Sequence, residues 1–402
     1  MKLHITLFAV LPFLLAADWL QFRGTDSNPV APSDKLPTTM SATENVAWKA
    51  PLVGDAVSGP IVVKGRVVVT ASSGPVQQDR LHVLCFDVKT GKQLWHRQLW
   101  ATGRPFCHPT SANAAPTPAS DGERIFAFYS SNDLVCLDLD GNLLWYRGLG
   151  YDYPKAGNDV GMSSSPLVVG DTVVVQSESQ GDPFAAGFDV ATGETRWRIA
   201  RPTKMNWVSP TAIRGQDGKQ VVLLQAGDGL AAFDPRTGNK LWSYDISSGP
   251  IPSATVVGGR IYLPAKGLTV LDAPADATSP SLAWDSNKLS PGNASPVVAD
   301  GKVYTLAKVG VLTCGSEKDG EVLWQVRLKG TFWATPVIAS GHAYCVNQEG
   351  QAFVVKLGKA EGEKGELIHT AELGEGFLGT PAIADNALYL RSEKNLWKIA
   401  SP

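Results

Sequence analysis

The chain has 402 residues, and its 36 lysines and arginines nearly balance its 38 aspartates and glutamates, which gives a formal net charge of −2. That balance argues against nucleic acid as a partner, because binding to phosphates needs a clustered positive excess. Hydrophobic residues make up 44% of the chain, which excludes wholesale disorder. The 40 glycines and 27 prolines predict many turns, and the spacing of the 12 tryptophans carries most of the remaining information.

Residues 1–17 are expected to be an export signal. Lys2 and His4 precede an apolar stretch, Ile5 to Ala17, which is shorter than the roughly 20 residues that span a bilayer. The stretch ends in Leu-Leu-Ala-Ala before Asp18, so we expect cleavage after Ala17. The alternative is a short buried strand. No other stretch of the sequence could span a membrane, and a periplasmic or secreted location follows from the signal.

The rest of the chain is built from repeats. CFDVKTGKQLW (85–95), GFDVATGETRW (187–197) and AFDPRTGNKLW (232–242) share a motif that ends in tryptophan, and three further segments vary it. Each unit opens with a small residue and a proline before a short apolar run, at Pro60, Pro116, Pro166, Pro210, Pro252, Pro296, Pro336 and Pro381. These prolines recur at a mean spacing of about 46 residues, which is typical of propellers and solenoids.

The content of one unit favours a propeller. After Pro210, a short strand precedes a turn at 215–218, and an alternating, β-branched run covers 220–226. A third strand at 230–234 and a fourth at 240–245 follow further glycine turns, and no helical period is present. Four strands joined by tight turns make one blade, with the proline at the inner edge, where a missing N–H is tolerated.

The repeated motif residues have structural roles. The motif glycine can take the positive φ that a hairpin turn needs, and Asp87, Asp189 and Asp234 can accept hydrogen bonds from the N–H groups of the turn. The tryptophan on the outer strand is expected to lie between adjacent blades, where its burial removes roughly 150–250 Å² from water. These blade-docking residues are Trp48, Trp95, Trp145, Trp197, Trp242, Trp284 and Trp324.

The count of units predicts eight blades in a single all-β domain over 18–402, with seven blades as the alternative. The seventh unit has His369 at the tryptophan position, and the eighth has only three strands before the chain ends. The segment NVAWKAPL (45–52) has the spacing of an outer strand. We therefore expect this N-terminal strand to complete the last antiparallel four-stranded blade and close the β-propeller.

Five cysteines are present, which forbids complete intramolecular pairing. Cys85, Cys136 and Cys314 lie where sister units have a small residue such as Gly187 or Ala232, so they are expected to be small buried side chains. The absence of a C-x-x-C motif leaves no case for a thiolate metal site.

The motif A/C/G-x-D-x-x-T-G-x-x-x-W resembles the repeat of the pyrroloquinoline-quinone (PQQ)-like propellers. This superfamily includes quinoprotein dehydrogenases and the outer-membrane assembly lipoprotein BamB. The opening DWLQFRG (18–24) is similar to the N-terminal segment of exported PQQ-like repeat proteins. The resemblance covers nearly all of the chain after residue 17. It predicts the fold more strongly than the function, because the motif residues are structural.

The resemblance to the dehydrogenases implies an adjacent Cys-Cys pair over the cofactor and a calcium site made by a Glu, an Asn and an Asp, with a further Asp as base. The chain has no Cys-Cys, and no motif ties the candidates Asn158, Asp159 and Asn293 together. The resemblance to BamB implies a lipidated N-terminal cysteine, which is absent, and this argues against work in membrane assembly. The favoured function is therefore a non-catalytic exported binding scaffold without cofactor or metal. A PQQ- and calcium-dependent quinoprotein dehydrogenase is the alternative.

A ligand is expected at the mouth of the central channel, which the loops before the inner strands surround. Four aromatic residues in these loops are not at the docking position, and they are mixed with amides, Asp159 and His108. Such a surface suits a protein, an extended peptide or a glycan bound to a monomer. Alternatively, the aromatic residues plug the channel or pack between blades. Cys107 and His108 do not suggest a catalytic pair, because adjacent residues rarely face each other and no third member is evident. The candidate residues are Trp207, Trp333, Phe332, Phe377, Asn206, Asn158, Asp159, Asn293 and His108.

Overall fold

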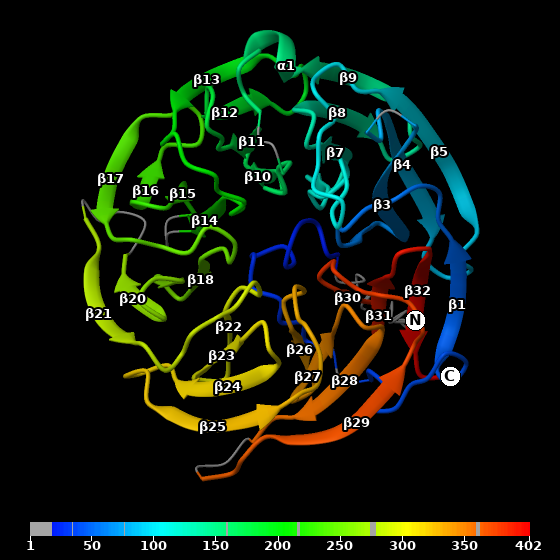
Figure 1. Ribbon diagram of the computed structural model, residues 1–402, viewed down its shortest axis with the longest axis vertical. Coiled ribbons are helices and arrows are strands. Elements are labelled where there is room, and N and C mark those ends of the chain that lie inside the picture. The colour runs from blue at the N-terminus through cyan, green and yellow to red at the C-terminus, as the bar shows by residue number, and fades with distance from the viewer. Residues whose placement is uncertain are drawn as a thin grey trace, which may run out of the picture.

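The computed structural model describes residues 18–33, 35–75, 77–157, 160–214, 218–273, 279–358 and 362–402. These residues form eight four-stranded antiparallel sheets arranged as a ring (Figure 1). The eight-bladed propeller is thus confirmed, and the seven-bladed alternative is excluded. Among the described residues, helix is limited to the single turn α1 (Leu149–Asp152), and no helix is long and apolar enough to cross a membrane. The predicted signal, 1–17, lies outside the described residues.

Seven blades run outward from the axis in chain order, and the eighth takes its outer strand from the start of the chain. The inner strands are β2 (Ile61–Val63), β6 (Ala119–Ser120), β10 (Leu167–Val169), β14 (Thr211–Arg214), β18 (Thr255–Val257), β22 (Val297–Ala299), β26 (Val337–Ala339) and β30 (Ala382–Ala384). The second strands are β3 (Arg66–Ser73), β7 (Arg124–Phe128), β11 (Thr172–Ser177), β15 (Gln220–Ala226), β19 (Arg260–Leu263), β23 (Lys302–Leu306), β27 (His342–Val346) and β31 (Ala387–Arg391). The third strands are β4 (Arg80–Asp87), β8 (Asp133–Asp138), β12 (Phe184–Asp189), β16 (Gly229–Phe233), β20 (Leu268–Asp272), β24 (Val311–Ser316), β28 (Gln351–Lys356) and β32 (Asn395–Ala400). The outer strands are β5 (Gln93–Trp100), β9 (Leu143–Gly148), β13 (Thr195–Ala200), β17 (Lys240–Asp245), β21 (Ser281–Ser286), β25 (Val322–Arg327), β29 (Glu366–Glu372) and β1 (Val46–Pro51).

The last blade combines the two ends of the chain. Its strand order is β1-β32-β31-β30, and β1 pairs antiparallel with β32, with Ala50 opposite Leu396 (Figure 1). The predicted closure by an N-terminal strand is therefore confirmed. His369 on β29 contacts the backbone of Met40, just before β1, through its Nε2 atom, so it lies at the junction between the last two blades.

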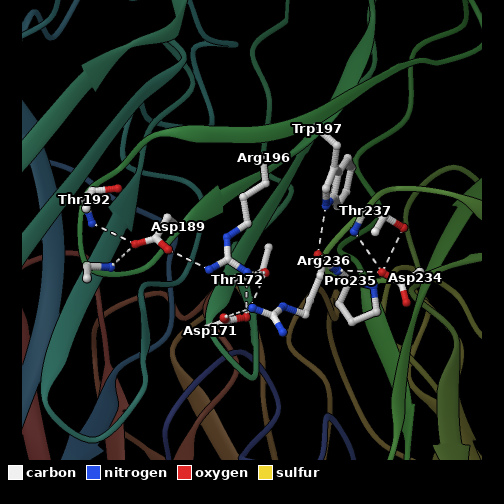
Figure 2. Close-up of polar contacts among 11 residues, drawn as sticks. Asp171, Thr172, Asp189, Thr192, Arg196, Trp197, Asp234, Pro235, Arg236 and Thr237 are labelled. Atoms are coloured by element: carbon white, nitrogen blue, oxygen red, sulfur yellow. Dashed lines mark hydrogen bonds and ion pairs between the residues drawn. The ribbon is translucent and has the colours of Figure 1, made fainter.

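The motif tryptophan of one blade packs against the motif turn of the next blade, as Figure 2 shows for Trp197. Its Nε1–H donates to the carbonyl oxygen of Pro235 at 2.8 Å, and a Cβ on Gly238 would lie 2.7 Å from the indole. In that turn, Asp234 Oδ1 accepts hydrogen bonds from the N–H and the hydroxyl of Thr237. Glycine is thus required at position 238 for two reasons, because the backbone φ is positive and because the indole leaves no room for a Cβ. Carbonyl groups of the next blade likewise accept from Trp48, Trp95, Trp145 and Trp284.

A second contact joins neighbouring blades near the axis. The backbone N–H just before each inner strand donates to the side-chain hydroxyl of the equivalent residue in the next blade, at 2.9–3.1 Å. We call these seven buried residues the hydroxyl ring: Thr117, Ser165, Ser209, Ser253, Ser295, Thr335 and Thr380. The eighth position is Gly59, where a Cβ would lie 2.4 Å from the carbonyl oxygen of Thr380. In seven of the eight repeats, the small residue that opens the repeat is therefore a hydrogen-bond acceptor for the preceding blade.

The hydroxyl ring corrects the register of two repeats. The residue after the ring position is Pro118 in the second blade and Ala254 in the fifth, because Thr117 and Ser253 make the inter-blade contacts. Pro116 and Pro252, which the repeat pattern placed at the strand starts, each lie two residues too early. The second blade has a further proline after the ring position and the fifth has none, so spacing alone could not distinguish the two registers.

The packing of tryptophan on glycine generates a stability prediction. In Gly238→Ala, the new Cβ would overlap the Trp197 indole, and overpacking of this kind costs about 1–3 kcal/mol. Gly301→Ala is the matched control, because Gly301 has φ of 70° against 69° for Gly238 and a Cβ added there would meet no heavy atom within 4 Å. We expect Gly238→Ala to lower the free energy of unfolding by about this amount more than Gly301→Ala in urea titrations. Equal losses would show that the indole contact contributes nothing.

The hydroxyl ring generates a second prediction. Ser209→Ala removes the acceptor for the buried N–H of Ser165, and an unpaired buried donor costs about 1–3 kcal/mol. Ser163→Ala is the control, since no hydrogen bond joins the Ser163 side chain to other described residues. Urea unfolding should show a loss for Ser209→Ala and almost none for the control. An unchanged midpoint for Ser209→Ala would mean that the inter-blade hydrogen bond is dispensable.

Candidate functional site

A cavity of about 460 Å³ lies at the end of the channel where the inner strands begin. Gly59 and all seven residues of the hydroxyl ring line it. The residue two positions before each ring position also lines it, in every blade. We call these eight residues the collar: Val57, Ala115, Ser163, Trp207, Ile251, Asn293, Trp333 and Leu378. The mouth of the channel therefore has two tiers, which are set by the same repeat that builds the blades.

Loops from three blades hold Trp207 in place. Its backbone N–H donates to the carbonyl oxygen of Pro250 at 2.8 Å, and its Nε1–H donates to that of Gly161 at 2.9 Å. Its half-buried indole forms part of the cavity wall. The other tryptophan of the collar, Trp333, is 36% exposed and donates its Nε1–H to Gln348 Oε1 at 3.1 Å, with the Lys308 ammonium 5.1 Å from the ring centroid. Both indoles are thus held by polar contacts and leave apolar surface facing the cavity.

The hydroxyl ring contributes hydrogen-bond donors. Each of its hydroxyl oxygens accepts one backbone N–H, but no hydrogen bond from these seven O–H groups to an acceptor is found within the described parts of the chain. A hydroxyl can donate and accept at once. The cavity therefore presents a circle of O–H groups that can donate to carbonyl, carboxylate or hydroxyl oxygens of a bound group.

Four of the candidate residues meet at this cavity: Trp207, Trp333, Asn293 and His108. His108 is held within its own loop, where Nδ1 accepts the N–H of Thr110 at 3.2 Å. Burial, together with the negative charge of Asp55, raises the pKa of Cys107, so its thiol is not activated. No hydrogen bond between Cys107 and His108 is present in the described structure.

Three other candidates do not reach the cavity. Phe332 is fully buried, with its ring centroid 5.6 Å from that of Phe353, and Phe377 is also buried. Asn206 is 2% exposed and donates its amide to Glu178 Oε2 and to the carbonyl oxygen of Gln225, both at 2.9 Å. The expectation that these three line the mouth was wrong. Each lies three positions before a ring residue, and its side chain points into the blade packing while the next residue points to the channel.

The buried contact of Asn206 still bears on the site, because it anchors the loop of Trp207. Glu178 also pairs with Arg201, Nε to Oε1 at 2.6 Å, and both side chains are almost completely buried. Burial raises the pKa of Glu178, although Arg201 and Asn206 favour the carboxylate. Asn206 is thus a structural residue that fixes the entry to the fourth blade.

The channel is divided by the chain's own N-terminal segment, residues 18–33, which we call the strap. It crosses the middle of the ring (Figure 1). Trp19 pairs with Val62 on β2, and Phe22 lines the mouth cavity. The Arg23 side chain, 1% exposed, donates to Thr255 Oγ1 at 2.6 Å and to the carbonyl oxygen of Ala254 at 2.8 Å. Burial lowers the pKa of Arg23 to about 9. The sequence suggested an exported-family segment here but did not indicate its place on the axis.

The donor set of the described mouth residues does not fit a calcium-dependent quinone site. The described residues around the cavity include hydroxyls, amides and aromatic rings but no carboxylate, and calcium is normally held by carboxylate oxygens. No group of three or more His, Cys, Asp or Glu side chains converges anywhere in the described ranges. Asn158 and Asp159, the other candidates for such a site, lie outside the described residues.

Comparison with known proteins agrees with this architecture. The family model described as "Outer membrane protein assembly factor BamB" matches residues 30–159, 155–263 and 267–364. A curated relative of that name from Burkholderia pseudomallei is 27% identical over 209 residues, which cover 49% of this chain and 47% of the relative. The match thus spans about half the length of that relative.

Two solved structures share the fold. The crystal structure of BamB from Moraxella catarrhalis superposes with a TM-score of 0.62 at 17% identity, covering 88% of this chain and 96% of the other. Quinohemoprotein alcohol dehydrogenase from Comamonas testosteroni superposes with a TM-score of 0.69 at 13% identity, covering 96% of this chain and 80% of the other. At these identities the two structures are evidence for the fold alone. Because the family model matches most of the sequence, the chain belongs to the BamB-like family of PQQ-repeat propellers.

Proposed function

We propose that this protein is a non-catalytic scaffold of the periplasm that binds a protein partner at the mouth cavity, in the service of outer-membrane protein assembly. The family model that matches most of the chain outweighs the sequence argument against membrane assembly. The curated relatives are named outer membrane protein assembly factors, which supports this setting. The observation that carries the proposal is the two-tiered mouth, with the indoles of Trp207 and Trp333 above a circle of O–H donors.

The chemistry of the mouth favours a polypeptide over a glycan. Val57, Ile251 and Leu378 place aliphatic surface between the two indoles, which suits apolar side chains of a partner. Backbone carbonyl oxygens of an inserted loop or extended peptide would accept from the hydroxyl ring. Tryptophan is enriched among the residues that dominate binding energy at protein interfaces.

Single substitutions of the collar tryptophans test this proposal. Loss of a central interface tryptophan commonly costs about 2 kcal/mol or more, so Trp207→Ala and Trp333→Ala should each weaken partner binding about thirtyfold. Trp100→Ala is the matched control, because Trp100 is 59% exposed on the outer strand β5 and does not line the cavity. Calorimetric titration with purified proteins of the outer-membrane assembly machinery would measure the affinities, and thermal melting would check that all variants are folded.

The same assay distinguishes the other hypotheses. If a defined oligosaccharide binds and the same two substitutions abolish that binding, the ligand of the mouth is a glycan rather than a protein. A thermal shift that requires both PQQ and calcium would instead establish the quinoprotein alternative. Equal affinities of all three variants for the protein partner would place its binding surface away from the mouth.

A further inference from the structure

The channel has a second cavity, of about 1150 Å³, on the other side of the strap. Strap residues from Leu20 to Val30 form one wall, and the distal ends of β10, β14 and β18 form the other. It therefore opens where the inner strands end, whereas the mouth cavity lies where they begin. Apolar residues (Val168, Ala212, Val256) and polar ones (Asp26, Arg214) both line it.

The middle residue of each inner strand directs its backbone toward the axis. In an antiparallel pair, residues alternate between bonding across the pair and pointing away from it. On the first blade, Val62 lies opposite Val67, and its N–H and C=O bond to Trp19 in the strap rather than to β3. Val168 opposite Val173, Ala212 opposite Val222 and Val256 opposite Ile261 occupy the equivalent place. Each lies three positions after the ring residue of its blade, as Val62 lies three after Gly59.

The strap pairs with these axial edges on four blades. Besides Val62, the N–H of Ser120 donates to the carbonyl oxygen of Leu20 at 2.7 Å. Ile338 bonds through both its N–H and its C=O to the strap backbone at 2.8 and 2.9 Å. On β22, the side-chain amide of Asn28 imitates a backbone, because it accepts from Val298 N–H at 3.1 Å and donates to Val298 C=O at 2.8 Å. All four inner-strand residues are 2–3% exposed.

In the described structure, four blades lack this cover: the eighth, where Ile383 is 2% exposed and away from the second cavity, and three neighbouring blades beside that cavity. For Val168, Ala212 and Val256, no hydrogen bond across the axial edge is found within the described parts of the chain. All three are half-buried rather than buried, and all three line the second cavity. On blade five, the described strap residues bond to the start of β18 through the side chain of Arg23. The strap thus leaves one continuous arc of unpaired strand edges, β10–β14–β18, beside an open cavity.

We propose that this arc binds an extended polypeptide segment of a partner protein through main-chain hydrogen bonds. The strap shows the binding mode, since an extended chain already pairs with the equivalent edges on four other blades of the same ring. The arc continues that interface, and the cavity exceeds the roughly 300–1,000 Å³ of typical small-ligand sites, which leaves room for several residues. Because the contacts are to backbone, recognition tolerates many sequences, as in other cases of strand addition.

This inference does not rest on the function proposed for the mouth. The strap separates the two cavities, and no collar or hydroxyl-ring residue lines the second one. Trp207→Ala should therefore leave binding at the arc unchanged. A failure of either proposal would leave the other standing.

The test is hydrogen–deuterium exchange of the full chain with a permanently unfolded polypeptide, reduced and carboxymethylated α-lactalbumin. Free axial amides in 167–169, 211–214 and 255–257 should exchange quickly, and the unfolded probe should slow them at all three segments. Native α-lactalbumin, which offers no extended segment, should not slow the exchange of these amides. Slowing at none of the three segments at saturating probe would overturn the proposal, and slowing only at the collar loops would assign the polypeptide to the mouth instead.

A register-matched pair of proline variants sharpens the test. Ala212→Pro deletes an N–H that the sheet does not use, so it should weaken binding of the unfolded probe about three- to tenfold at an unchanged melting temperature. Val62→Pro deletes the equivalent N–H where the strap uses it, so it should lower the melting temperature and leave probe binding unchanged. If Ala212→Pro proves less stable, Val256→Pro replaces it. Full probe affinity in a folded variant would show that the axial N–H groups do not bind the chain.

Discussion

The hydrogen bond from a backbone N–H to the hydroxyl of the next blade organises the centre of this molecule. It fixes the distance between consecutive inner strands and orients the loop that precedes each of them. Once the ring residue is placed, the side chain two positions earlier faces the channel and the one three positions earlier faces the blade. The alternation explains why Trp207 and Trp333 reach the mouth while Asn206 and Phe332 do not. The mouth is therefore a product of the repeat, and its chemistry is set by eight collar residues.

The outer rim is held by a different contact, the indole lying on a turn glycine. The two contacts act at opposite ends of the blades, one polar and near the axis, the other apolar and at the circumference. Because both join a blade to its neighbour, each blade is held on both sides by the adjacent ones. The strap adds a third kind of link, since it joins blades that are not neighbours by pairing with their inner edges.

Much of the fold could be predicted from the sequence, and the reasons are local. The unit after Pro210 has turn residues and alternation that place all four of its strands within a residue or so of their observed bounds. The aspartate and glycine of the motif act within one turn, so their roles are visible in a single repeat. Trp48 and its spacing identify β1, because an outer strand has the same pattern wherever it occurs in the chain.

The site was harder to predict, because it depends on positions relative to the axis. The sequence alone does not show whether an aromatic residue in an inner loop faces the channel, as Trp333 does, or packs inside the blade, as Phe332 does. The signal that separates them is the offset from the ring hydroxyl. Pro116 and Pro252 obscured that offset in two blades, and in the others nothing in the sequence marked the ring hydroxyl as the reference point. The sequence of 18–33 did not indicate the axis either, because most of the strap's contacts are made by its backbone, which any sequence could supply, and only Arg23 and Asn28 add side-chain hydrogen bonds to the inner strands.

The pairing of β1 with β32 has a consequence for the order of folding. Val46 finds its partner at Ile399, at the far end of the sequence. Contacts of such long sequence separation form slowly, because the loop they close must first be ordered. The ring therefore closes only after the last residues are available. The strap can pair with the inner-strand edges only when several blades have formed. During synthesis residues emerge from the N-terminus onward, so the strap and β1 appear early and yet are among the last segments to find their positions.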